Sequence, residues 1–112
     1  MGNLSSDRQV REYNRFCKKL KFIEGNEINV KVNQKFASRF SANFTLPPEY
    51  QGKIPQIKSK DEEILLVEER SFYPYPDGWC GGRTFCIYVF KATKKGNYKI
   101  KYDTCEINVT VN

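Results

Sequence analysis

The sequence contains no histidine among its 112 residues. Without an imidazole, the chain cannot build a Ser-His-Asp or Cys-His catalytic centre, a histidine metal site or the usual pH switch near neutrality. It also has no glycine-rich phosphate-binding loop and no apolar run long enough to span a bilayer. Few routes to catalysis remain. We therefore expect a protein that is not an enzyme and that needs no cofactor.

Two remaining groups of reactive side chains do not change this expectation. The adjacent acids Asp61 to Glu63 are typical of a solvated loop. Cys80 lies close in sequence to Arg83, which could stabilise a thiolate. Nothing nearby supplies an acid for a leaving group, so a cysteine nucleophile is not expected.

The net charge of +6 is unevenly distributed along the chain. Residues 61–69 hold five acids and no base, whereas residues 83–102 hold six bases and no acid. Blocks of this kind are usually solvated strand faces. The alternation of Tyr and Lys over residues 98–102 could serve nucleic-acid binding, but it equally describes a half-buried strand. We expect no nucleic-acid partner.

The hydrophobicity pattern divides the chain into two parts. Residues 1–22 form a basic N-terminal extension, in which apolar residues recur at helical spacing and predict a short amphipathic helix: Val10, Tyr13, Phe16, Cys17 and Leu20. Such a helix is marginal unless it docks on the domain. From residue 23 to residue 112 the period becomes two, which is typical of strands with one buried face.

Seven short strands are expected in the second part, over residues 28–32, 36–44, 54–57, 64–72, 84–92, 98–102 and 107–111. The continuous apolar run Ile64 to Val67 predicts a strand covered on both sides. Charged residues 58–63 predict an exposed segment, and Lys94 to Asn97 predicts a hairpin turn. Prolines and glycines predict loops over residues 46–55 and 73–82. The pattern favours an all-β fold, an immunoglobulin-like antiparallel β-sandwich without the Cys-Trp-Cys spacing of antibody domains.

The four cysteines predict no metal site, because no two of them have the two-residue spacing of a zinc knuckle. They allow three disulfide pairings, among which the sequence does not choose. The polar stretch Asn3 to Arg15 does not resemble a secretory signal. We therefore expect reduced thiols and a cytoplasmic location.

The first six residues, Met-Gly-Asn-Leu-Ser-Ser, fit the pattern for myristoylation of Gly2. Six basic residues follow between Arg8 and Lys21, and a basic segment is the usual second anchor beside a single acyl chain. The pattern predicts membrane association through N-terminal acylation. The alternative is a short terminus that matches the pattern by chance.

Loops at one end of such a sandwich project together and can form a binding surface. Tyr73, Tyr75 and Trp79 are rigid anchors in the second loop, and Gly81 and Gly82 allow close approach of the backbone. The alternative is that Trp79 folds back over the end of the sandwich.

The order of these features resembles the chagasin-like family of cysteine-protease inhibitors. The resemblance covers residues 28–111 and is carried by the stretch Trp79 to Phe85, then Val89 to Ala92, Gly96 and Ile100 to Tyr102, preceded by the strand Leu66 to Phe72. It implies an immunoglobulin-like fold whose loops insert into the active-site cleft of papain-like proteases, with the glycine-rich loop nearest the catalytic cysteine.

Only the middle loop of the family matches residue by residue, at Gly81, Gly82 and Thr84. In the first loop, residues 46–52 keep only proline and glycine of the family's Asn-Pro-Thr-Thr-Gly motif. The third, Arg-Pro-Trp loop is absent, because Tyr102 to Cys105 turns almost at once into the last strand. The protease-binding residues expected are Pro48, Glu49, Tyr50, Tyr75, Trp79, Cys80, Gly81, Gly82, Arg83 and Thr84.

The expected function is therefore inhibition of a papain-like cysteine protease by a monomer. The alternative is a non-inhibitory adhesion or adaptor domain on the same fold, tethered to a membrane through Gly2. A disulfide between Cys80 and Cys105, in loops predicted to be adjacent, would stiffen the binding surface and lower its ordering cost.

Overall fold

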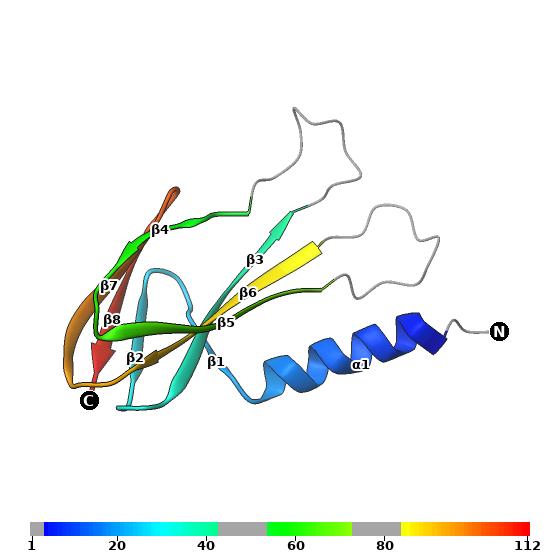
Figure 1. Ribbon diagram of the computed structural model, residues 1–112, viewed down its shortest axis with the longest axis horizontal. Coiled ribbons are helices and arrows are strands. Elements are labelled where there is room, and N and C mark those ends of the chain that lie inside the picture. The colour runs from blue at the N-terminus through cyan, green and yellow to red at the C-terminus, as the bar shows by residue number, and fades with distance from the viewer. Residues whose placement is uncertain (1–3, 43–53, 73–83) are drawn as a thin grey trace.

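The computed structural model describes residues 4–42, 54–72 and 84–112. They form one helix and eight strands: α1 (Leu4–Lys18), β1 (Lys21–Phe22), β2 (Glu27–Val30), β3 (Lys35–Ala42), β4 (Ile57–Lys60), β5 (Ile64–Phe72), β6 (Thr84–Ala92), β7 (Gly96–Tyr102) and β8 (Glu106–Val111). The strands make two four-stranded sheets, in the orders β1-β3-β6-β5 and β2-β8-β7-β4. The two sheets pack together (Figure 1), which confirms the predicted all-β sandwich.

Four of the six strand pairs among the described residues are antiparallel, and the pairs β1–β3 and β2–β8 are parallel. Parallel neighbours need a long connection between them. The chain provides one in each case, because β2 in the opposite sheet separates β1 from β3, and five strands separate β2 from β8 in the sequence.

The main core lies between the sheets and is rich in aromatic residues. Phe36 of β3 stacks on Phe90 of β6 with ring centroids 5.6 Å apart, and both side chains are fully buried. β6 is the central strand of this core, as its sequence predicts. Cys86, Tyr88 and Phe90 face the opposite sheet, whereas Ile87 and Val89 face the other way and are also buried.

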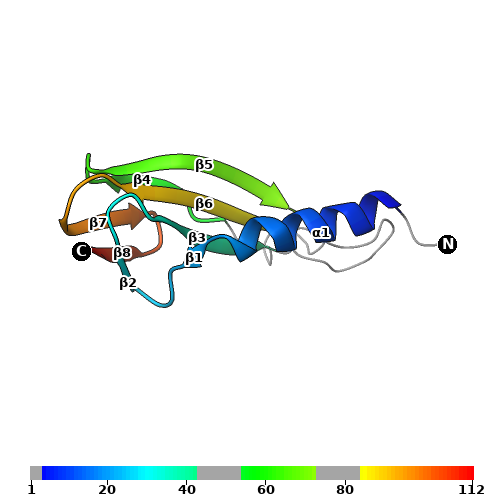
Figure 2. The same ribbon diagram turned by 90° about the horizontal axis from the view of Figure 1, so that it is seen from below.

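A second apolar cluster covers the outer face of sheet β1-β3-β6-β5, where α1 packs against it (Figure 2). Four of the five apolar residues predicted from helical spacing belong to this cluster: Tyr13, Phe16 and Cys17 of α1, and Leu20 just after it. The fifth, Val10, is half-buried and does not belong to it. The N-terminal segment therefore adds a third layer to the sandwich. This docking explains how a helix of 15 residues is stable.

The expectation that residues 64–67 are covered on both sides is wrong for three of the four. Ile64 is buried, but Leu65, Leu66 and Val67 are 43%, 39% and 44% exposed. β5 is the edge strand of its sheet, and the pairing with β6 shifts between Leu66 and Glu68, which forms a bulge at this point. A continuous apolar run does not distinguish an edge strand from a covered one.

Residues 58–60 are exposed, as expected, but they belong to strand β4, which starts where the expected 54–57 strand would end. The expected hairpin at Lys94 to Asn97 is instead a crossover, because β6 and β7 belong to different sheets. Lysine and glycine mark a turn whether the turn makes a hairpin or a crossover, because the local sequence does not say which sheet the next strand joins.

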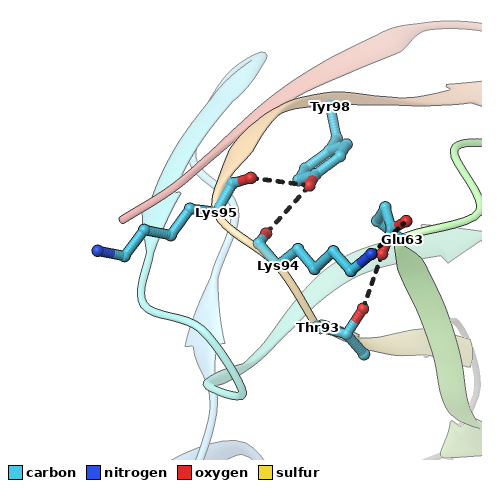
Figure 3. A network of polar contacts seen from close by, with 5 residues as sticks. All are labelled: Glu63, Thr93, Lys94, Lys95 and Tyr98. Carbon is cyan, nitrogen blue, oxygen red and sulfur yellow. Dashed lines mark hydrogen bonds and ion pairs between the residues drawn. The ribbon is translucent and has the colours of Figure 1, made fainter.

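Side-chain contacts fix this crossover (Figure 3). The Thr93 hydroxyl donates to Glu63 at 3.0 Å, and Lys94 Nζ lies 3.9 Å from the same carboxylate. The Tyr98 hydroxyl is shared between the carbonyl oxygens of Lys94 and Lys95, at 3.1 and 3.0 Å. The turn is thereby tied both to the start of β5 and to β7.

Candidate functional site

The two segments expected to bind a protease arise from neighbouring strands. Ala42, where β3 ends, is the register partner of Thr84, where β6 begins. Phe72, where β5 ends, is the partner of Phe85. The points at which residues 43–53 and 73–83 are attached therefore lie side by side, at the ends of neighbouring strands of one sheet (Figure 1).

Of the ten expected protease-binding residues, the structure places one. Thr84 is half-buried at the first position of β6. Outside the described residues lie Pro48, Glu49, Tyr50, Tyr75, Trp79, Cys80, Gly81, Gly82 and Arg83. Gly2, the expected acylation site, also lies outside them. What the structure defines is the scaffold from which the two segments start.

The third expected segment is a tight turn. The amide of Tyr102 donates to the carbonyl of Cys105 at 2.8 Å, which closes the turn between β7 and β8. The amide of Asp103 donates to the carbonyl of Gln56 at 3.0 Å, so the turn is tied to the residues that lead into β4. Only Asp103 and Thr104 lie between the closing residues. The turn is too short to project as a separate binding loop.

The two sheets diverge toward this end of the sandwich (Figure 1). The β7–β8 turn is therefore separated from the ends of β3, β5 and β6 in the other sheet. Tyr102 contacts Phe40 with ring centroids 4.9 Å apart, two residues before β3 ends. The turn and the attachment points of the other two segments thus belong to the same end of the sandwich, and those attachment points are immediate neighbours.

A buried cluster of tyrosines supports this end of the sandwich. The Tyr102 hydroxyl shares a hydrogen bond with Ser38, the buried polar residue of β3. The Tyr88 hydroxyl donates to the carbonyl of Pro55 at 2.8 Å and so fixes the chain just after residues 43–53. Burial raises the pKa of both tyrosines well above the ordinary value, and both hydroxyls stay neutral near pH 7. Their role is to satisfy polar atoms inside the core.

An aromatic clamp holds the strands on either side of residues 73–83; it consists of Tyr13, Phe16, Phe72 and Phe85. Tyr13 lies 5.3 Å from the Phe72 ring and 5.3 Å from the Phe85 ring, and Phe16 lies 5.4 Å from Phe72. The helix therefore packs directly against the attachment points of the proposed binding loop. The sequence predicts the helix, but its spacing carries no signal for which strands it covers.

Two arginines complete the clamp by stacking on its rings. The Arg70 guanidinium lies 4.9 Å from the centre of Phe16 and 4.7 Å from that of Phe72. Arg39 lies 5.9 Å from the centre of Phe85 and donates a hydrogen bond of 2.9 Å to the Tyr13 hydroxyl. Partly desolvated contacts of this kind contribute about 0.5–1 kcal/mol each.

The cysteines that the structure describes provide neither a disulfide nor a metal site. Cys17, Cys86 and Cys105 are free thiols, and within the described ranges no group of three or more His, Cys, Asp or Glu side chains could hold a metal ion. The disulfide expected between Cys80 and Cys105 is therefore not formed at Cys105. Reduced thiols agree with the default expectation from the sequence.

A hollow of about 620 Å³ lies beside β1 and β2 and is lined by Lys21, Phe22, Glu24, Glu27, Ile28 and Asn29. It contains none of the expected site residues. In the part of the chain that the structure describes, no helix is long and apolar enough to cross a membrane.

Comparisons with known proteins add no identification. No protein-family model matches the chain, and neither a curated protein nor a solved structure matches it.

Proposed function

We propose that this protein inhibits papain-like cysteine proteases by inserting two neighbouring segments, residues 46–52 and 73–84, into the active-site cleft. The observation that carries the proposal is the register of one sheet, in which Ala42 pairs with Thr84 and Phe72 with Phe85. This register makes both segments start side by side on a rigid β-scaffold. A cleft is filled best by adjacent, preorganised segments, because less conformational entropy is lost on binding.

In the proposed complex, the backbone at Gly81 and Gly82 lies nearest the catalytic cysteine of the protease. Two residues without a Cβ allow the chain to approach that sulfur and cover it. Tyr75 and Trp79 supply rigid apolar contact area in the same segment, and Glu49 and Tyr50 contact the cleft from the other. The family resemblance of residues 79–85 supports this assignment.

The contact surface proposed here has two segments rather than three. The β7–β8 turn at Asp103 and Thr104 is short, and it is tied to Gln56. Affinity then depends on how well the two remaining segments are held. The aromatic clamp at the attachment points of residues 73–83 and the hydrogen bond from Tyr88 to Pro55, just after residues 43–53, both help to hold the two segments.

A titration of active papain with the full-length protein tests the proposal. We expect stoichiometric or submicromolar inhibition, with the inhibitor recovered uncleaved by mass spectrometry. Trp79→Ala should weaken inhibition at least tenfold, because buried aromatic anchors contribute most of the binding free energy. Lys95→Ala, an exposed residue at the opposite end of the sandwich, serves as the matched control and should not change it.

The proposal is wrong if papain and a cathepsin both stay fully active at micromolar protein. It is also wrong if Trp79→Ala and Lys95→Ala inhibit as well as the unchanged protein. Binding to the protease without loss of activity would favour the alternative, a non-inhibitory protein-binding domain on the same fold.

A further inference from the structure

The outer side of α1 carries a row of positive charges, which we call the basic ridge: Arg11, Arg15, Lys18 and Lys19. All four are exposed. Because the helix turns by 100° per residue, Arg11, Arg15 and Lys18 lie on one face, opposite the face of Tyr13, Phe16 and Leu20. That opposite face is the one packed on the sheet. The docking of the helix therefore fixes the ridge as an outward-facing surface of the domain.

Acidic residues do not neutralise most of this surface. Among the residues described, no carboxylate lies within ion-pair distance of Arg15, Lys18 or Lys19. Glu12 is the one acid between Val10 and Lys19. Glu68, on the neighbouring edge strand, lies 3.9 Å from Arg70 instead. The part of the ridge formed by Arg15, Lys18 and Lys19 is thus a cationic surface without a nearby carboxylate.

The ridge is suited to a charged surface rather than to nucleic-acid bases or to insertion into hydrocarbon. Stacking on bases needs exposed aromatic rings. Both aromatic residues of α1, Tyr13 and Phe16, are instead packed against the sheet. The same packing occupies the apolar face with which an amphipathic helix would enter a bilayer. What remains for a partner is positive charge alone.

We propose that the basic ridge docks this protein on an anionic lipid surface. Each Lys or Arg near such a surface contributes about 1 kcal/mol of attraction, and Arg15, Lys18 and Lys19 together give a useful but salt-sensitive affinity. The Met-Gly-Asn-Leu-Ser-Ser pattern favours lipid over other polyanions. It places an acylation site at Gly2, two residues before α1 begins, and a myristoyl chain needs a basic second anchor.

Docking through the ridge would place sheet β1-β3-β6-β5 toward the lipid and the opposite sheet away from it. The axis of α1 runs along the long dimension of the molecule, toward the end from which residues 73–83 leave (Figure 2). The proposed binding end would then point along the membrane surface rather than into it. The docking proposal does not depend on protease inhibition.

Sedimentation with large vesicles tests the proposal, using the full, non-acylated chain in 20 mM salt. Vesicles of phosphatidylcholine alone are compared with vesicles that also contain one-quarter phosphatidylserine. The test variant is Arg15→Gln, Lys18→Gln, Lys19→Gln. Its matched control removes an equal number of positive charges from the other sheet, at exposed positions of β4 and β7: Lys58→Gln, Lys60→Gln, Lys101→Gln.

We expect binding to the phosphatidylserine vesicles only, with a loss of at least tenfold in the ridge variant and less than threefold in the control. Raising salt to 200 mM should abolish most of the binding. Arg15 and Lys18 also stabilise the last turn of α1 through the helix dipole, so circular dichroism must show the helix unchanged. If the helix is lost, Lys19→Glu alone, outside α1, replaces the triple variant.

Four results would overturn the proposal. Equal losses in the two triple variants would mean that net charge, not the ridge, drives binding. Equal binding to neutral vesicles would mean that apolar residues insert. Ridge-dependent binding to RNA or heparin without binding to phosphatidylserine vesicles would assign the ridge to another polyanion. Protein acylated at Gly2 by co-expression with a myristoyltransferase should bind the phosphatidylserine vesicles at least tenfold more tightly than neutral ones; equal binding to both would also exclude a role for the ridge.

Discussion

Tyr13 of the N-terminal helix packs edge-on against Phe72, with ring centroids 5.3 Å apart and planes at 69°. Phe72 is the last residue of β5, directly before residues 73–83, and Tyr13 also reaches Phe85 on the far side of that segment. A single helix residue therefore bridges the two attachment points of the proposed inhibitory loop. This contact links the N-terminal segment, which lies outside the family resemblance, to the segment that carries it.

Tyr13→Ala should weaken protease inhibition without unfolding the protein. Loss of the half-buried ring removes two aromatic contacts and costs about 1–3 kcal/mol of the free energy of unfolding. The strands flanking residues 73–83 lose their clamp, so the loop pays a larger ordering cost on binding. We expect the inhibition constant to rise about tenfold or more, mainly through faster dissociation, measured by progress curves with papain.

A matched control separates this positioning role from general destabilisation. Val109→Ala removes a buried side chain from the opposite sheet, far from the clamp, at a similar cost in stability. It should leave the inhibition constant unchanged. Tyr13→Phe keeps the ring contacts and loses the hydroxyl that accepts a hydrogen bond from Arg39, so it should inhibit almost normally. If Val109→Ala and Tyr13→Ala weaken inhibition equally, the clamp has no specific role.

Gly96→Ala should destabilise the crossover between the two sheets. Gly96 has a φ of +150°, which residues with a side chain rarely adopt, and an added Cβ would lie 3.0 Å from the Tyr98 hydroxyl oxygen. That hydroxyl bonds to the carbonyl oxygens of Lys94 and Lys95 (Figure 3). We expect a loss of about 1–3 kcal/mol in urea unfolding.

Gly25→Ala is the comparison for Gly96. Gly25 also has a positive φ, of +66°, but nothing lies within 4 Å of an added Cβ. It should cost only the backbone strain, about 1 kcal/mol. Equal effects at the two glycines would show that the contact with Tyr98 is unimportant.

Period-two patterns were sufficient to predict most of the strands and the sandwich. β6 shows why: its two apolar faces alternate strictly, and each face is buried against a different layer. The helix is equally well predicted, because Tyr13, Phe16, Cys17 and Leu20 share one face. The repeat of apolar residues lies within a single stretch of sequence, so it predicts a helix or strand without knowledge of the rest of the fold.

Features that depend on distant strands were not predictable in the same way. The run Leu65 to Val67 is exposed because β5 has a neighbour on one side only, and the sequence of β5 does not encode its place in the sheet. The turn at Lys94 and Lys95 marks a reversal but not the change of sheet. For the candidate site, nothing in the spacing of Tyr13 predicts its contact with Phe72. That contact follows from the packing of α1 on three strands at once.

Removal of either partner of the Ser38–Tyr102 hydrogen bond should be costly. Both residues are buried, at 3% and 4% exposure, and neither side chain has another hydrogen-bond partner among the residues that the structure describes. Tyr102→Phe and Ser38→Ala each leave a buried polar atom unpaired, which costs about 1–3 kcal/mol. The double variant should cost less than the sum of the two, as measured by denaturant unfolding. Strictly additive losses would mean that the two hydroxyls do not depend on each other.

Stability should fall at alkaline pH because of the buried tyrosines. Burial raises the pKa of Tyr88 and of Tyr102, whereas both ionise near pH 10 in the unfolded chain. Below pH 10 both states hold these protons and the full stability is present. Above pH 10 the unfolded state loses them first, so the free energy of unfolding drops by up to about 1.4 kcal/mol per pH unit for each residue.

The comparison for this pH dependence is Tyr88→Phe. It removes one of the two groups, and the slope of stability against pH between pH 10 and pH 11 should become less steep by about that amount. Urea unfolding at four pH values between 9 and 11 measures it. A slope that is the same in Tyr88→Phe and in the unchanged protein would show that this tyrosine ionises freely in the folded state.

Cys86 should be the least reactive of the three described thiols. Burial raises the pKa of the Cys86 thiol, and the negative charge of Glu69, whose Oε1 lies 4.0 Å from the sulfur, raises it further. Only the thiolate is alkylated, and the side chain is 4% exposed, whereas Cys17 and Cys105 are half-buried. In native protein at pH 8 we expect iodoacetamide to modify Cys86 at least tenfold more slowly than the other two, followed by peptide mass spectrometry. In 6 M guanidinium chloride the three rates should become equal, because the folded environment alone sets the difference. Equal rates in native protein would mean that the core between the two sheets opens far more readily than its packing implies.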